Sequence, residues 1–91
     1  MLTKSIVVNR PRGLEARPIA ELVQVASKYE SSVYLEHASR RVNAKSIMGM
    51  MSLDVSAGES IEVTIDGKDE EYAMEEIAAF LCVKEKAMVI A

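Results

Sequence analysis

The stretch Val42-Asn43-Ala44-Lys45-Ser46-Ile47-Met48-Gly49-Met50-Met51-Ser52-Leu53 changes its pattern at the serine. Before Ser46 apolar and polar residues alternate, which is typical of a strand with one buried face. After Ser46 the run is rich in methionine and suits a short helix, and serine is a favoured residue at a helix start. The stretch therefore predicts a strand followed by a short helix over residues 46–53, with Ser46 at its N-terminus.

The residues before this stretch predict a strand, a helix and a hairpin. Residues 2–8 are rich in β-branched side chains, and a loop with Pro11 and Gly13 follows them. Residues 32–36 and 41–44 alternate, so His37-Ala38-Ser39-Arg40 should connect two paired strands. Between loop and hairpin, a helix from residue 15 or 16 to about residue 29 is expected from apolar residues at helical spacing, namely Ala16, Ile19, Ala20, Val23 and Ala26 or Ser27.

The residues after it predict a loop, a strand and a final helix. Residues 54–60 contain Gly58 and suit a loop, and residues 60–66 alternate cleanly as a strand. Asp69 is the expected N-cap of the helix, and Glu70 and Glu71 favour its positive start. Its buried stripe should comprise Ala73, Ile77, Ala78 and Leu81. The apolar end, residues 87–91, is expected to be a packed or paired segment.

The element order is thus strand, helix, strand, strand, short helix, strand, helix. One antiparallel sheet with helices on one face is the simplest way to bury three amphipathic helices. The 91 residues suffice for one domain, residues 1–91, and the sequence shows no repeat or linker. From the residues alone the fold class is α+β.

Composition and charge exclude several classes of protein. Hydrophobic residues make up 49% of the chain and charged residues 27%, which argues against disorder. The net charge of −3 gives no broad attraction to nucleic acid. Cys82 is the only cysteine and cannot form an intrachain disulfide, so we expect a small buried apolar residue there. Without a signal-peptide pattern or an apolar run long enough to span a membrane, a cytoplasmic protein is expected.

Two predicted helix starts are the candidate functional sites. One is Gly13-Leu14-Glu15-Ala16-Arg17-Pro18, and the other is the stretch that carries Ser46. The free N–H groups of a helix start favour anions, which makes both segments candidates for phosphate chemistry.

Together these segments resemble HPr, the histidine-containing phosphocarrier protein family of the bacterial sugar phosphotransferase system. The resemblance covers essentially the whole chain and implies an open-faced β-sandwich of order βαββαβα, with a four-stranded antiparallel sheet covered on one face by three helices. It implies that Ser46 is the regulatory serine that is phosphorylated. It also puts Glu15 where the family has its phosphocarrier histidine.

Glu15 alters the implied chemistry. An imidazole accepts and returns a phosphoryl group near neutral pH, whereas a carboxylate repels phosphate and competes for Arg17. The combination of a replaced histidine and a retained serine is similar to the Crh-type members of the family from bacilli, although these usually carry glutamine. Ile19 and Arg12 are further departures from the family pattern near the same surface.

The resemblance also implies partners. HPr kinase/phosphorylase would modify Ser46, and the product would be a corepressor of catabolite control protein A, a LacI-type repressor that itself contacts the DNA. Ile47, Met48 and Met51 could all be core, but the resemblance assigns them, with Arg17, to an exposed partner-binding surface. On this reading the chain is no enzyme and uses no cofactor or metal.

Two alternatives stay open. The chain could be a phosphocarrier component of the sugar phosphotransferase system with an altered active site. It could also be an adaptor that regulates a metabolic enzyme in its unphosphorylated form. Incubation with phosphoenolpyruvate and enzyme I separates the first alternative from the regulatory reading, and a pull-down with and without serine phosphate separates the second.

Overall fold

Four antiparallel strands form one sheet in the order β1-β4-β2-β3. The computed structural model describes residues 1–10 and 13–82, so the expectations for Arg12 and for residues 87–91 lie outside the described part. The elements are β1 (Leu2–Val7), α1 (Ala16–Ser27), β2 (Ser32–His37), β3 (Arg40–Asn43), α2 (Ile47–Met51), β4 (Ser60–Asp66) and α3 (Glu70–Leu81). The predicted order βαββαβα is confirmed.

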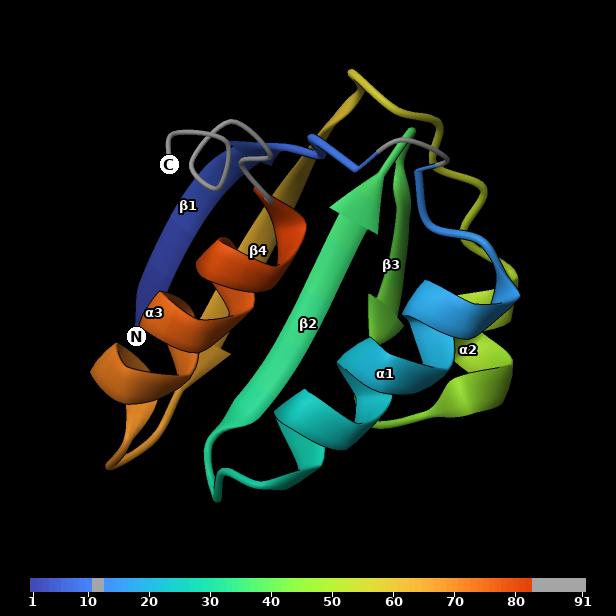
Figure 1. The fold of residues 1–91 in the computed structure, drawn as a ribbon. Helices are drawn as coiled ribbons and strands as arrows, with labels where there is room; N and C mark the ends of the chain where they lie inside the picture. The colour runs from blue at the N-terminus through green and yellow to red at the C-terminus, as the bar shows by residue number, and fades with distance from the viewer. Residues whose placement is uncertain (11–12, 83–91) are drawn as a thin grey trace, which may run out of the picture.

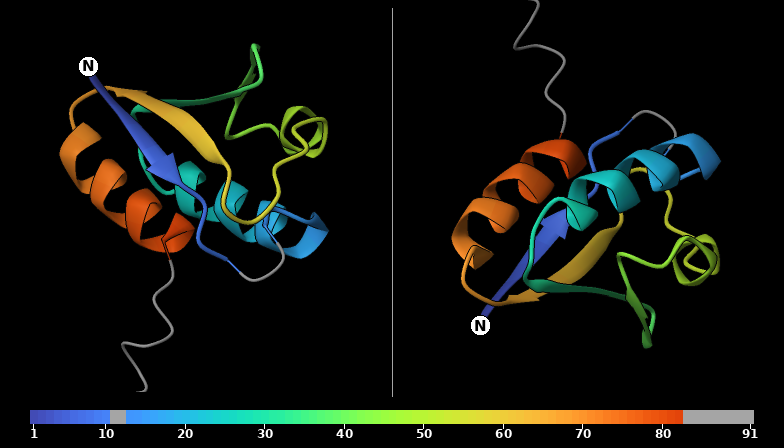
Figure 2. Two further views of the ribbon diagram at one scale, coloured as in Figure 1. Left: turned by 90° about the horizontal axis from the view of Figure 1, so that it is seen from above. Right: turned by 90° about the horizontal axis from the view of Figure 1, so that it is seen from below.

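The helices form a layer on one side of the sheet (Figure 1). α3 packs against β1 and β4, α1 packs against α3 and α2, and α2 contacts β3. The views from above and below show α1 and α3 side by side on one face, with α2 beyond them near β3 (Figure 2). The opposite face of the sheet carries no helix of the described part, which is the open-faced arrangement predicted above.

The core lies between the sheet and the helices, and the alternation of β4 shows why. Ile61, Val63 and Ile65 point inward and are buried, while the residues between them face outward. The same core takes Ile19, Leu22 and Ala26 from α1 and Ala73, Met74, Ile77 and Leu81 from α3.

The structure corrects the edges of the predicted stripes in the two long helices. Leu22 and Met74 belong to the core although neither was in a predicted stripe, whereas Ala20, Val23 and Ala78 are only partly buried. Of the alternatives Ala26 and Ser27, Ala26 is the buried one. A 3.6-residue period leaves the edges of a helical stripe undetermined, and the neighbouring helices and strands decide them.

The hairpin between β2 and β3 turns within two residues. Ala38 and Ser39 have positive φ angles of 52° and 68°, and His37 pairs with Arg40 across the strands. This corrects the prediction of a four-residue connection. Two residues in the left-handed region match the twist of the strands, but asparagine and glycine usually stand at these positions. The dipeptide Ala38-Ser39 therefore did not indicate a two-residue turn.

Asp69 lies at the predicted N-cap of α3, but its side chain does not cap the helix. Its carboxylate instead accepts hydrogen bonds from the amides of Glu30 and Ser31, at 2.9 and 3.0 Å, and from the Ser31 hydroxyl. The pKa of this carboxyl is lowered, first by the Ser31 hydroxyl and then by the amide of Glu30. Asp69 thus ties the start of α3 to the turn between α1 and β2.

Cys82 follows α3 and is only partly buried, which corrects the expectation of a buried residue. Its Sγ lies 3.4 Å from the carbonyl oxygen of Val7 and donates to it. The thiol therefore bridges the end of α3 and the end of β1.

Candidate phosphorylation and partner-binding site

Ser46 is the N-cap residue of α2. Its backbone is extended, and its Oγ accepts a hydrogen bond from the amide of Gly49 at 3.3 Å. The residue is exposed to solvent. α2 is one short turn, Ile47–Met51, rather than the 46–53 expected, so the N–H groups of that turn matter here more than any helix dipole. The hydroxyl of Ser46 is accessible to a modifying enzyme.

α2 divides its apolar side chains between the core and solvent. Met50 is completely buried, whereas Ile47, Met48 and Met51 are 46%, 81% and 59% exposed. Such a group of exposed large apolar side chains on one short helix is a feature of interaction surfaces. Methionine is flexible and polarizable, which helps it adapt to a partner.

Glu15 lies at the N-cap of α1 and is exposed, as is Arg17. Within residues 1–10 and 13–82, neither side chain forms an ion pair or a hydrogen bond. The expectation that Glu15 competes for Arg17 therefore has no support in the structure. Ile19 is also not part of this surface, because it is buried in the core.

The start of α1 is joined to the segment that follows α2. The amide of Leu14 donates to the carbonyl oxygen of Val55 at 3.0 Å. Gly13, at a φ of +65°, lies so close to this segment that a Cβ would overlap the Val55 carbonyl oxygen and lie 2.8 Å from the amide nitrogen of Ala57. Only glycine fits there. This contact and the packing of α1 against α2 bring the two candidate segments together (Figure 1).

A hydrogen-bond network that sequence reasoning missed supports the other end of α1. Lys45 Nζ donates to the carbonyl oxygen of Tyr29 at 2.7 Å, and the Tyr29 hydroxyl donates to Glu76. Lys28 forms an ion pair with Glu76 at 2.8 Å. The pKa of Glu76 is lowered, first by Lys28 and then by Tyr29, and the pKa of Tyr29 is raised by Glu76. Lys45, directly before Ser46, is thus held against the segment that follows α1. No local pattern marks a lysine that binds a distant carbonyl.

No metal centre competes with this interpretation in the described part of the chain. The structure contains no group of three or more His, Cys, Asp or Glu side chains there that could hold a metal ion. In the same residues, no helix combines the length and the apolar character needed to cross a membrane.

Comparison with known proteins identifies the family. The family model described as "PTS HPr component phosphorylation site" matches residues 2–82. The chain belongs to the HPr family. This HPr-family chain is 44% identical over 81 residues to the HPr-like protein Crh of Bacillus subtilis, which covers 89% of the chain and 95% of that protein. It is 47% identical over 78 residues to the phosphocarrier protein HPr of Xylella fastidiosa, covering 86% and 88%.

Solved structures agree with the HPr fold. The crystal structure of the phosphocarrier protein HPr from Bacillus anthracis superimposes with a TM-score of 0.85 at 41% identity, covering 88% of this chain and 95% of that one. The names of these relatives, phosphocarrier protein and HPr-like protein, describe proteins that are not enzymes, in agreement with the sequence prediction.

Proposed function

We propose that this HPr-family chain is a cytoplasmic regulatory protein that HPr kinase/phosphorylase phosphorylates on Ser46. The phosphorylated form acts as corepressor of catabolite control protein A in carbon catabolite repression, and the chain does not carry phosphate at position 15. The observation that carries the proposal is an exposed Ser46 at a helix start, in a chain whose resemblance to the family puts Glu15 at the position of the histidine. Relatives named HPr-like protein Crh support the regulatory reading.

The chemistry proposed at Ser46 is transfer of the γ-phosphoryl group of ATP to Oγ, with ADP and the hydroxyl proton released. The phosphate adds about −1.5 to −2 charges at neutral pH. It lies next to the amide of Gly49, which already donates to Oγ. The modification therefore needs no rearrangement of α2, and its main effect is a new charge on the surface.

The partner surface combines this charge with apolar and cationic groups. Phosphate oxygens accept charge-assisted hydrogen bonds from basic residues of a partner. Ile47, Met48 and Met51 supply exposed apolar area beside Ser46. Arg17, which has no ion-pair partner among residues 1–10 and 13–82, offers its guanidinium to a carboxylate of the repressor. The chain is acidic overall, so DNA contact is assigned to the repressor and not to this protein.

Titration of the Ser46-phosphorylated protein against the repressor tests the proposal. Binding should require phosphorylation and should be absent for Ser46→Ala. Arg17→Ala and Met48→Ala should each cost more than about 1 kcal/mol of binding free energy if they are anchors. Lys68→Ala is the control, because Lys68 is exposed in the turn between β4 and α3, far from α2 (Figure 1). Equal binding of both forms would refute the corepressor role and favour the adaptor alternative.

A phosphocarrier with an altered active site is the second candidate, because relatives at 47% identity are named phosphocarrier protein HPr. Incubation with phosphoenolpyruvate and enzyme I decides between the two. Phosphorylation of the wild-type chain would establish carrier activity, whereas a chain that gains no phosphate would favour the regulatory function.

A further inference from the structure

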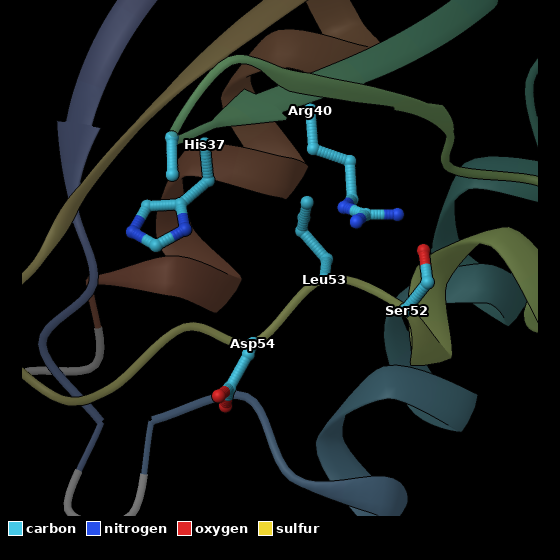
Figure 3. A pocket seen from close by; sticks show the side chains of 6 residues that line it. His37, Arg40, Ser52, Leu53 and Asp54 are labelled. Atoms are coloured by element: carbon cyan, nitrogen blue, oxygen red, sulfur yellow. The ribbon is translucent and has the colours of Figure 1, made fainter.

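A recess of about 270 Å³ lies between the β2–β3 turn and the end of α2, and neither Ser46 nor Glu15 nor Arg17 lines it. It is lined by His37, Ala38, Arg40, Ser52, Leu53 and Asp54 (Figure 3). One of these residues, Leu53, is buried in the hydrophobic core, so this side of the recess is formed by the core of the fold.

Arg40 supplies the positive charge. Its guanidinium extends across the recess toward Ser52 (Figure 3) and, within the described part, has neither an ion-pair partner nor a hydrogen bond. The adjacent Arg41 differs, because its guanidinium stacks on the Tyr34 ring, 4.7 Å from the centroid. Successive strand residues point to opposite faces, so the two arginines serve different surfaces. Of these two arginines, it is Arg40 that lines the recess and can meet an anion there.

Three further polar side chains, from His37, Ser52 and Asp54, line the same recess. The carboxylate of Asp54 has no hydrogen-bond partner among the residues that the structure describes. His37 directs Nε2 to Glu59, at 3.2 Å, and its Nδ1 has no partner among the residues that the structure describes, so Nδ1 can hydrogen-bond with a hydroxyl group of a ligand. The Ser52 hydroxyl donates to the carbonyl oxygen of Gly49 at 2.7 Å and retains lone pairs for a second bond.

We propose that this recess binds a small anionic polyol, a sugar phosphate or a sugar acid. The anionic group pairs with the Arg40 guanidinium, whose planar donors match phosphate and carboxylate oxygens. Hydroxyl groups of the polyol hydrogen-bond with Asp54, His37 Nδ1 and Ser52. Because these three groups lie at different places in the recess, several hydroxyl groups on one carbon chain fit them better than a single ammonium group. The volume is slightly below that of typical small-molecule sites, which suits a ligand of monosaccharide size.

The test uses the full-length unphosphorylated protein and follows amide chemical shifts by NMR. The probes are ribose 5-phosphate, gluconate, free ribose and inorganic phosphate. Saturable shifts at His37, Arg40, Ser52 and Asp54 are expected with ribose 5-phosphate or gluconate, and these two probes tell a phosphate ligand from a carboxylate ligand. Ribose and inorganic phosphate should each bind at least about tenfold more weakly, because each lacks half of the contacts.

Matched variants locate the site. Arg40→Gln and Asp54→Asn should each weaken binding by about tenfold, while Arg41→Gln should leave it unchanged. The proposal is overturned if neither anionic polyol causes saturable shifts, if Arg41→Gln has the same effect as Arg40→Gln, or if inorganic phosphate binds as tightly as ribose 5-phosphate. Neither kinase nor repressor takes part, so this result is independent of the function proposed for Ser46.

Discussion

The amide of Leu14 and the carbonyl oxygen of Val55 form a hydrogen bond of 3.0 Å that joins the residue before Glu15 to the segment after α2. This bond holds the start of α1, which carries Glu15 and Arg17, beside the segment that follows α2. The residues proposed to contact the repressor therefore lie on neighbouring segments of the fold, although they are far apart in the sequence.

The close approach of Gly13 to Val55 predicts a strong effect of Gly13→Ala. The left-handed backbone alone costs about 1–2 kcal/mol for a residue with a side chain, and the Cβ would also overlap the Val55 carbonyl oxygen. We expect a loss of more than about 2 kcal/mol of unfolding free energy, measured by urea unfolding. Gly58→Ala is the control, because φ is +90° there but nothing lies within 4 Å of the new Cβ. Equal losses in both variants would contradict the close-approach argument.

The cap formed by Ser46 predicts that its hydroxyl supports α2. Ser46→Ala should lower the unfolding free energy by about 1 kcal/mol, because the amide of Gly49 loses its acceptor. Ser56→Ala is the control, since this exposed hydroxyl makes no hydrogen bond within the described residues, and its change should stay below about 0.5 kcal/mol. Mass spectrometry after incubation with HPr kinase/phosphorylase and ATP should find one phosphate on the wild type and none on Ser46→Ala. A phosphate on Ser39 or Ser52 would refute the assignment.

Two neighbouring methionines should respond in opposite ways to truncation. Met50→Ala removes a fully buried side chain and should cost about 2–5 kcal/mol of stability. Met48→Ala removes a side chain that is 81% exposed, so stability should hardly change while binding of the phosphorylated protein to the repressor falls. Unfolding curves and binding titrations on both variants measure the two effects. A stable Met48→Ala variant with unchanged repressor affinity would remove Met48 from the proposed surface.

The lowered pKa of Asp69 predicts a loss of stability in acid. Since the folded protein holds this pKa below its ordinary value, the stabilisation is fully present above the ordinary value and is lost as the pH falls through the folded value. Asp69→Asn should therefore reduce the slope of unfolding free energy against pH on acidification. A residual slope is expected from Glu70 and Glu76, whose pKa values are also lowered. The same slope in Asp69→Asn and in the wild type would contradict this prediction.

Position 15 should control phosphoryl transfer. The wild type should gain no phosphate from phosphoenolpyruvate and enzyme I, because a carboxylate replaces the nucleophilic imidazole. Glu15→His should restore at least partial labelling, since Gly13, Arg17 and Pro18 remain in the same loop. Radiolabel on the intact chain measures both outcomes. An unlabelled Glu15→His variant would mean that another difference in this region, such as Arg12, blocks the carrier reaction.

Local patterns were sufficient to predict the element order and most element bounds. Alternation in β4 and helical spacing in α1 and α3 depend on the geometry of each segment alone, so these elements appear where the residues indicate them. The short helix at Ser46 was also predictable, because a serine before an apolar run acts within one turn. By itself, the sequence determined which segments form strands and helices and where Ser46 and Glu15 stand in them.

Only the tertiary structure decided which distant groups meet. The carboxylate of Asp69 binds the turn before β2 instead of its own helix, and Lys45 reaches the carbonyl of Tyr29. The two-residue turn at Ala38 turns the chain back so that Arg40 faces Ser52 across a recess (Figure 3). The periodicity of a segment indicates only which of its own residues share a face. The contacts described here depend on how whole helices and strands pack together, and burial of the shared core determines that packing.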